Sequence, residues 1–427
     1  MIASLAAPHN KYDKRTLGRS LAEPAPINLQ SQSMPSAPYR SVYAYPWDVL
    51  ESGPTRFADI LASQRLTEVT IAVSYHAGKF LRTRSDSSRV YFPEDGTVYF
   101  EPDLKRYGRI KPVPHPDKKL RQVAAGLVQA DRLGVHAWTV VFHNSRLGVA
   151  YPDATVRNAW GDRYPYSLCP VNPEVAAFGV ALVEDLSRAL SVASIVLETI
   201  GFLPYAHGYH HEFAQTKITP WMSVLLALCF CEHCLKESKR ETGIDSNALR
   251  KRVEAKVDDY LQSAVDIPAD IALAWTTADI LSDEELSGYL KWRSRRVSEL
   301  LKQFRAAVSA KLAIIPTIQR PTASTWIEGS DIKALAEIAD YLEVPFYEPT
   351  AQRAIADAWD TLHRTGNDPT KIRALLRPGP PDLGDGQELV EAIQGIAQLG
   401  IRDFAFYNWG LLRKRDFERI GPALSRV

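Results

Sequence analysis

The sequence predicts an α/β fold, more specifically a (β/α)8 TIM barrel. Apolar runs typical of buried parallel strands alternate with segments of helical periodicity, and eight such runs can be counted. Polar or aromatic side chains follow most of the runs, as they do at the carboxyl ends of barrel strands. An open doubly wound sheet is the alternative, but no Gly-rich dinucleotide-binding turn or P-loop follows any run.

The strands and helices alternate along most of the chain. The strands are expected at 42–45, 66–75, 135–142, 195–198, 312–319, 340–347, 372–378 and 403–409. Helical periodicity is found at 118–133, 173–190, 247–264, 283–310, 330–339, 351–364, 387–399 and 415–424.

Two segments do not fit the plain alternation. Residues 89–102 hold two short aromatic runs on either side of Asp95-Gly96, which predicts a β-hairpin inserted after the second strand. Residues 235–310 are too long for an ordinary crossover, so they predict a helical insertion after the fourth strand.

Composition sets the domain organisation and excludes some classes of function. Residues 1–40 have prolines and serines but no sustained period, which predicts a flexible N-terminal arm before a barrel domain at 41–427. The net charge of +1 does not favour nucleic acid as a partner. No apolar run approaches the roughly 20 residues that span a bilayer, and no signal peptide is recognisable, so a cytoplasmic location is expected.

The cysteines form the strongest single motif. Three of the four in the chain, Cys229, Cys231 and Cys234, have the spacing Cys-x-Cys-x-x-Cys, and Cys169 is the fourth. Tetrahedral zinc takes four such ligands, so we expect a closed, structural zinc site. A disulfide, or four buried thiols without a metal, are the alternatives.

The segment from Trp160 to Cys234 resembles the catalytic barrel of family 42 glycoside hydrolases, which are β-galactosidases. The resemblance lies in Arg163, in YSLCPVNP at 166–173, in a strand ending in a glutamate, and in CFCEHC at 229–234. It implies a carbohydrate substrate, a homo-oligomer and an acid/base role for Glu198, and some members of the family bind zinc through an equivalent cysteine set. The chain differs from the family pattern at Leu197, where asparagine is expected, and at the seventh strand, which offers Arg377 instead of a glutamate.

Glycoside cleavage requires a protonated carboxyl group and a second, ionised one. Glu198 is the first candidate for the general acid/base, and Glu212 follows it because three histidines precede it. Glu343 is the preferred second carboxylate, with Glu348 and Asp382 as alternatives. A salt bridge between Glu343 and Arg377 would be the structural alternative.

Other residues at the strand ends are expected to bind substrate hydroxyl groups or to stack on sugar rings. The alternatives are a second metal site made of the histidines with Glu212, and ordinary packing of the aromatic residues. The predicted substrate-binding residues are Trp47, Tyr75, His76, His143, Asn144, His207, His210, His211, Glu348, Arg377, Tyr407 and Trp409.

These observations together predict an enzyme that cleaves a glycosidic bond, β-galactosidase-like or related, with a pair of carboxylates at the carboxyl-terminal face of the barrel. A metal-dependent lyase or isomerase acting on a sugar-like substrate is one alternative. A carbohydrate-binding barrel without activity is another.

Overall fold

The computed structural model describes residues 37–209 and 212–427. Most of the predicted N-terminal arm, residues 1–36, lies outside the described residues. Its last residues already belong to the barrel, because Tyr39 is buried and strand β1 (Arg40–Ala44) begins at Arg40. The ordered domain therefore begins slightly before the boundary predicted at residue 41.

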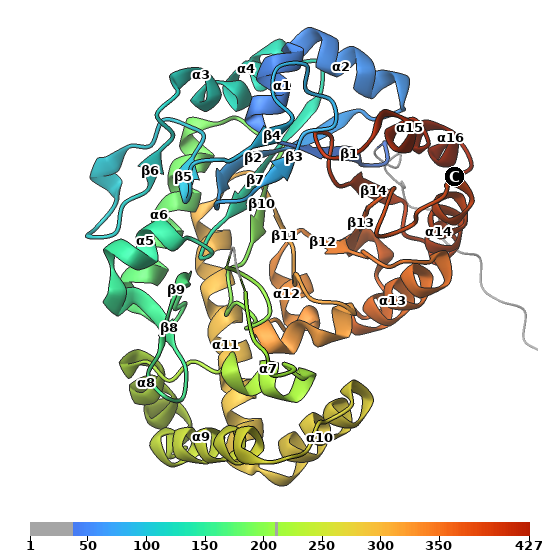
Figure 1. The fold of residues 1–427 in the computed structure, drawn as a ribbon. Helices are drawn as coiled ribbons and strands as arrows, with labels where there is room; N and C mark the ends of the chain where they lie inside the picture. The colour runs from blue at the N-terminus through green and yellow to red at the C-terminus, as the bar shows by residue number, and fades with distance from the viewer. Residues whose placement is uncertain (1–36, 210–211) are drawn as a thin grey trace, which may run out of the picture. The chain divides into compact units, whose positions relative to one another are not determined.

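Eight parallel strands of the described chain form a closed barrel, as predicted (Figure 1). Strand β1 pairs with β2 on one side and with β14 on the other, and this double pairing closes the barrel. The order after β1 is β2 (Glu68–Tyr75), β7 (Gly134–Val140), β10 (Ser194–Glu198), β11 (Lys311–Ile314), β12 (Tyr341–Pro345), β13 (Ile372–Leu376) and β14 (Asp403–Phe406).

Helices surround the barrel (Figure 1). The longer ones start where the sequence supplies caps: in α6 the side chain of Asn172 accepts a hydrogen bond from the backbone of Glu174, and Pro173 occupies the first turn. The surrounding helices are α1 (Pro46–Ser52), α2 (Pro54–Ser63), α3 (Lys118–Arg121), α4 (Val123–Ala130), α6 (Pro173–Ala189), α11 (Glu284–Ala307), α12 (Ile332–Ile338), α13 (Ala351–Arg364), α14 (Gly386–Gln398), α15 (Lys414–Phe417) and α16 (Ile420–Leu424).

The hairpin predicted at 89–102 is wrong in its pairing. Strand β4 (Val90–Tyr91) pairs with β3 (Phe80–Leu81), whereas β5 (Thr97–Val98) pairs antiparallel with the end of β2 and parallel with β6 (Val113–Pro114). Pairing with β2 adds β5 to the main sheet, a contact that no local turn signal reveals. The other short elements are α5 (Ser145–Ala150), β8 (Thr155–Arg157), β9 (Arg163–Leu168), η1 (Leu104–Arg106), η2 (Pro152–Ala154), η3 (Thr322–Glu328) and η4 (Pro369–Lys371).

The helical segment after β10 has two parts. Helix α11 packs against α6 and α12, so it is the regular crossover helix between β10 and β11. The additional part consists of α7 (Pro220–Leu226), α8 (Glu232–Thr242), α9 (Ser246–Gln262) and α10 (Ala269–Ser282), which lie below the barrel in Figure 1. The insertion predicted at 235–310 therefore includes one helix that belongs to the barrel.

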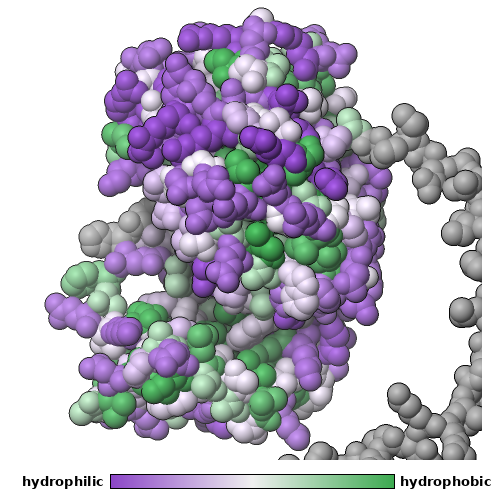
Figure 2. Space-filling model, turned by 90° about the vertical axis from the view of Figure 1, so that its right-hand side faces the viewer, coloured by the Kyte–Doolittle hydropathy of each residue, from purple (hydrophilic) through white to green (hydrophobic). Residues whose placement is uncertain are grey.

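The surface is mixed in character. On the face shown in Figure 2 hydrophilic residues predominate, and hydrophobic ones are most frequent towards the bottom of the view. Helix α10 exposes Leu273, Trp275 and Leu281. Within the described ranges, no helix has the length and apolarity that a membrane span needs.

Successive residues of the strands enter two separate cores, as the alternation of side chains in a barrel requires. In β1, Val42 and Ala44 join the large core that also contains the helix residues Phe57 and Leu61. Tyr43 belongs instead to a smaller, aromatic-rich cluster that also includes Trp138. The interior of the barrel is therefore rich in aromatic rings that carry a polar group.

A buried polar network lies in this interior and contains Glu343, which is completely buried. The hydroxyl of Tyr39 donates a 3.0 Å hydrogen bond to Glu343, and a guanidinium nitrogen of Arg373 lies 3.7 Å from its other oxygen. The guanidinium group of Arg373 lies between the rings of Tyr39 and Tyr341, at 3.8 and 3.9 Å from their centroids. Glu343 and Arg373 therefore form a buried, mutually dependent pair.

Replacing Glu343 with alanine is expected to lower the free energy of unfolding by about 3 kcal/mol, because Arg373 would keep a buried charge without its partner. Urea denaturation measures the change. The same substitution at Glu337, which is exposed on α12, serves as the control and is expected to have little effect. Equal stability of the two variants would contradict a structural role for Glu343.

Candidate active site

A cavity of 320 Å³ opens at the carboxyl-terminal end of the barrel. All eight barrel strands contribute to it, either from their last residues or from the loop that follows. This is the position at which barrel enzymes carry their active sites. The residues that line the cavity are Tyr43, Tyr75, His76, Trp138, Glu198, His207, Ile315, Ile318, Gln319, Arg320, Pro345, Tyr347, Leu375, Arg377 and Tyr407.

Glu198 is the last residue of β10 and faces the cavity. The indole nitrogen of Trp138, on the neighbouring strand β7, donates a 2.5 Å hydrogen bond to its carboxylate. Burial raises the pKa of Glu198 from its ordinary value of 4.5 to about 7, although the hydrogen bond from Trp138 acts in the opposite direction. Glu198 is therefore part protonated and part ionised near neutral pH, as a general acid/base should be.

Tyrosine hydroxyls surround the same space. The hydroxyl of Tyr45 donates to that of Tyr75 at 3.1 Å and lies 2.9 Å from that of Tyr407. Burial, assisted by the negative charge of Glu198, raises the pKa of Tyr75 and of Tyr407. These hydroxyls are thus neutral at physiological pH and can donate hydrogen bonds.

The predicted histidines form a stacked row beside the cavity. The ring of His76 stacks on that of Tyr75 at 4.3 Å and on that of His143 at 4.0 Å, and His207 meets His143 edge-on at 5.6 Å. Burial lowers the pKa of His207, so its imidazole is neutral at pH 7. His76 and His207 line the cavity, whereas His143 does not line it and contacts both of these rings. His210 and His211 lie outside the described residues.

Two arginines form the opposite part of the wall. Arg320 follows β11 and Arg377 follows β13, and both donate hydrogen bonds to Asp382, at 3.0 and 2.8 Å respectively. The guanidinium group of Arg377 also lies 4.2 Å from the centroid of the Tyr347 ring. Asp382 is therefore a partner of two cavity arginines and is itself withdrawn from the cavity.

The structure does not bring the two predicted catalytic carboxylates together. Glu343 lies among the buried network described above and does not line the cavity. Tyr43 lines the cavity, and the negative charge of Glu343 adds to burial in raising the pKa of Tyr43. Glu212 is exposed and lines a neighbouring pocket of 630 Å³ together with Tyr166.

Four of the predicted substrate-binding residues do not line the cavity and contact other parts of the protein instead. Asn144 caps α5 by accepting a hydrogen bond from the backbone of Leu147. Glu348 is buried and accepts a 2.6 Å hydrogen bond from Arg353. The other two are aromatic: the ring of Trp47 stacks on Tyr45, and the ring of Trp409 packs edge-on against Phe57 and Phe417.

The sequence analysis missed Tyr43, Trp138, Tyr347 and Glu328. The first two lie inside apolar strands, where their inward direction is invisible in the pattern. Glu328 accepts hydrogen bonds from the hydroxyl of Thr317 and from the backbone of Ile318, at 2.5 and 3.0 Å. Burial raises the pKa of Glu328 to about 7, and the charge of Glu198 contributes to the shift. Glu328 holds the segment that brings Ile318 and Gln319 to the cavity.

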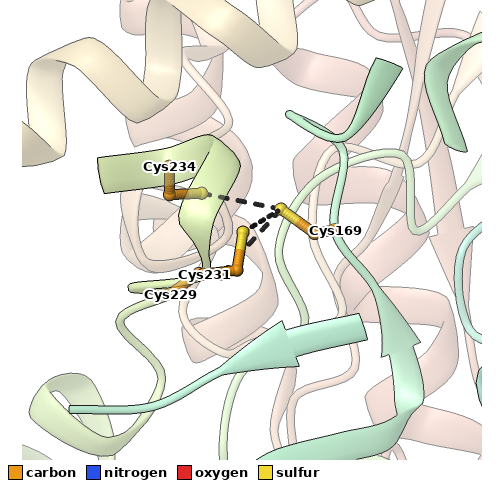
Figure 3. A group of neighbouring side chains, drawn as sticks. All are labelled: Cys169, Cys229, Cys231 and Cys234. Atoms are coloured by element: carbon orange, nitrogen blue, oxygen red, sulfur yellow. Dashed lines mark hydrogen bonds between the residues drawn. The ribbon is translucent and has the colours of Figure 1, made fainter. Parts of the chain in front are cut away.

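The four cysteines form a compact, buried cluster outside the barrel (Figure 3). The sulfur of Cys169 lies 3.8, 3.6 and 3.5 Å from the sulfurs of Cys229, Cys231 and Cys234. Tetrahedral zinc with Zn–S bonds of about 2.3 Å would hold its sulfurs about 3.8 Å apart, so the donor set fits this ion. Burial raises the pKa of Cys169 and of Cys234, and a bound cation would replace the protons of these thiols.

The raised pKa of Glu198 leads to a test that requires no substrate. The folded state binds more protons than the unfolded state between pH 4.5 and about 7, so the contribution of Glu198 to stability is present at low pH and is lost as the pH rises through 7. Replacing Glu198 with glutamine removes this pH dependence. The free energy of unfolding of the variant, relative to that of the native protein, should therefore be higher at pH 8 than at pH 4, by on the order of 2 kcal/mol after allowance for partial exposure.

Denaturation of both proteins at several pH values measures this difference. The substitution of Glu337 with glutamine on the surface of α12 is the matched control. A difference in stability that does not change with pH would show that Glu198 ionises at its ordinary pKa.

Comparison with solved structures finds other proteins that have this barrel fold. The chain aligns with the glycoside hydrolase domain of PgaB (BpsB) from Bordetella bronchiseptica over 91% of its own length and 99% of that chain, with a TM-score of 0.55 and 15% identity. It aligns with α-L-fucosidase isoenzyme 2 from Paenibacillus thiaminolyticus over 92% of its own length and 49% of that chain, with a TM-score of 0.54 and 13% identity. No protein-family model and no curated protein sequence matches the chain. At these identities the likeness shows that the chain shares the barrel fold of these enzymes.

Proposed function

We propose that this protein is a glycoside hydrolase in which Glu198 is the general acid. The observation that carries the proposal is the environment of Glu198, a carboxyl group with a pKa of about 7 at the mouth of an aromatic-lined barrel. The shared fold with two glycoside-cleaving enzymes and the resemblance of residues 160–234 to family 42 both support it. A β-galactosidase-like specificity rests on that resemblance alone.

The chemistry follows from the groups around the cavity. The protonated carboxyl of Glu198 donates its proton to the oxygen of the glycosidic bond as that bond breaks, and the carboxylate that forms accepts the hydrogen bond from Trp138. The neutral hydroxyls of Tyr75 and Tyr407 offer hydrogen bonds to the substrate. Their rings exclude water and thereby maintain the raised pKa of Glu198.

Cleavage also requires a group that attacks the anomeric carbon or activates water. Within residues 37–209 and 212–427, Glu198 is the one carboxylate that lines the cavity. His207 lines the same cavity with a neutral imidazole, which is able to accept a proton from water. We assign this second role to His207. For the same role the sequence suggested Glu343, with Glu348 and Asp382 as alternatives, whereas Glu212 was its second candidate for the general acid/base.

Hydrolysis of a panel of nitrophenyl glycosides tests the proposal. Replacing Glu198 with glutamine is expected to lower kcat about 10²- to 10⁴-fold, as expected for the loss of a general acid. The rate of the native enzyme should fall above pH 7, where Glu198 loses its proton.

Variants of His207 and of two carboxylates that the sequence suggested as catalytic belong in the same assay, namely His207→Gln, Glu212→Gln and Glu343→Gln, and Glu337→Gln is the control. We expect the His207 variant to lose more activity than the other two. An enzyme that keeps its native rate without Glu198 would contradict the proposal, as would the absence of hydrolysis throughout the panel.

A carbohydrate-binding barrel without activity is the second candidate function. It is favoured by one observation, the absence of a second carboxylate among the described residues that line the cavity. This function would be supported if the native protein hydrolysed no glycoside and if sugar binding were retained after replacement of Glu198. An activity abolished by chelation of a divalent ion at the histidines would instead indicate a metal-dependent lyase or isomerase.

We also propose that Cys169, Cys229, Cys231 and Cys234 hold a structural zinc ion, since their sulfur spacing and burial fit this metal. Four thiolate ligands leave no open coordination position, so the ion would stabilise the fold and take no part in the reaction. Cys169 follows β9, whereas Cys229 and Cys231 directly precede α8 and Cys234 lies in its first turn. The site would fasten the helical insertion to the loop before α6.

Elemental analysis of the purified protein is expected to find about one zinc per chain. Removal of the ion should lower the free energy of unfolding by about 2.7 kcal/mol, the value for a ligand present at 100 times its dissociation constant. Cys229→Ser should lower both the zinc content and the stability. Because all four cysteines belong to the cluster, metal-free protein resupplied with zinc is the control. Full stability without metal would exclude the structural role.

A further inference from the structure

The charge of the cavity wall points to the class of sugar that the cavity accepts. Arg320 and Arg377 both line the cavity, and they share one carboxylate, that of Asp382. The side chain of Asp382 is 1% exposed, whereas those of Arg320 and Arg377 are 48% and 27% exposed. The two positive groups thus face the open space and their common partner does not, which leaves one positive charge uncompensated at the wall.

While Glu198 carries its proton, no other group among the described residues of the lining compensates this charge. Glu198 is the one carboxylate among the described residues that line the cavity, and it must carry a proton to act as an acid. His207 is neutral at pH 7 because burial lowers its pKa. A substrate without charge would leave the excess positive charge at the wall unpaired, whereas an anionic substrate would neutralise it.

Arg377 and Glu198 line the same cavity, together with the rings of Tyr347 and Tyr407. The guanidinium group of Arg377 is 4.2 Å from the centroid of Tyr347 and 5.7 Å from that of Tyr407. Beyond the effect of burial, the pKa of both tyrosines responds to the negative charge of Glu198 and to the positive charge of Arg377. An anion held by Arg377 would thus lie in the same cavity as the carboxyl group of Glu198.

A cavity that combines excess positive charge with a carboxylic acid suits a uronic acid. In a hexuronide the carboxylate is attached to the carbon next to the ring oxygen, and the anomeric carbon is the other neighbour of that oxygen. The carboxylate and the scissile bond are therefore attached to the two carbons that flank the ring oxygen of a single pyranose ring. A planar guanidinium group binds a carboxylate through two parallel hydrogen bonds, and a second guanidinium beside it adds charge.

We infer that the substrate is a uronic acid glycoside, whose carboxylate is bound by Arg377 and Arg320 while its glycosidic oxygen faces Glu198. This inference rests on the proposed function, because it uses Glu198 as the acid. It adds a substrate class that the resemblance to β-galactosidases does not imply. The rings of Tyr347 and Tyr407 line the cavity that would hold the sugar.

Binding measurements test the inference without requiring turnover. The ligands are the methyl glycosides of glucuronic and galacturonic acid, with those of glucose and galactose as neutral counterparts, titrated by ligand-observed NMR. The native protein and Glu198→Gln should both bind at least one uronide about 10-fold more tightly than its neutral counterpart, as expected for charge-assisted hydrogen bonds. Arg377→Gln should abolish this preference, and Arg377→Lys should keep part of it.

Two controls make the result specific. Arg364→Gln removes an exposed arginine of α13 that does not line the cavity, and it should leave the preference unchanged. Methyl glucoside 6-sulfate distinguishes a sulfated sugar from a uronide, and tighter binding of the sulfate would overturn the assignment of a carboxylate. Equal binding of charged and neutral sugars, no binding of either, or an equal loss of both in Arg377→Gln would also overturn the inference.

The outcomes separate this inference from the proposed function. A preference for uronides in a protein that hydrolyses none of them would support the substrate class and contradict the hydrolase. Hydrolysis of neutral glycosides without a preference for uronides would do the reverse.

Discussion

The structure depends on the closure of one parallel hydrogen-bonded ladder, in which β1 pairs with both β2 and β14. Because all eight strands run in the same direction, closure brings their carboxyl ends to a single rim. Tyr45 and Tyr407 are separated by 362 positions in the sequence, yet their hydroxyls lie 2.9 Å apart at this rim. No short segment of the chain holds enough aromatic surface to bury Glu198, so the properties of that carboxyl group arise only from the closed barrel.

Two buried glutamates show how surroundings decide the role of a side chain. Glu343 has the hydroxyl of Tyr39 and the guanidinium of Arg373 as partners, and it is completely enclosed. Glu198 has one hydrogen bond from Trp138 and an open cavity in front of it. The first arrangement holds a charge in place, whereas the second leaves the carboxyl group free to exchange a proton with a ligand. Burial raises the pKa of both, so access to the cavity distinguishes them.

The sequence was sufficient for the fold and for the position of Glu198, since the alternation of strands and helices and the end of a strand are local features. It was not sufficient for the orientation of residues inside strands, because a strand covered on both faces shows no polar alternation. For this reason Trp138 was missed and Glu343 was taken for the second catalytic carboxylate. Asn144 was taken for a ligand contact, although an asparagine before a helix is also a common cap. The pairing of β5 with β2 depends on long-range contacts that turn residues do not encode.

The cysteine cluster has a consequence for the entropy of the chain. Cys169 and Cys229 are 60 positions apart, and the segment between them contains β10 with Glu198 and His207. An ion bound by the four sulfurs acts as a cross-link that closes this segment into a loop. Cross-links stabilise chiefly by restricting the unfolded chain, and the effect grows with the logarithm of loop length. Metal binding would thus reduce the conformational entropy of the unfolded chain in the segment that carries Glu198. The unfolded chain outside this loop would keep the entropy that it has without the metal.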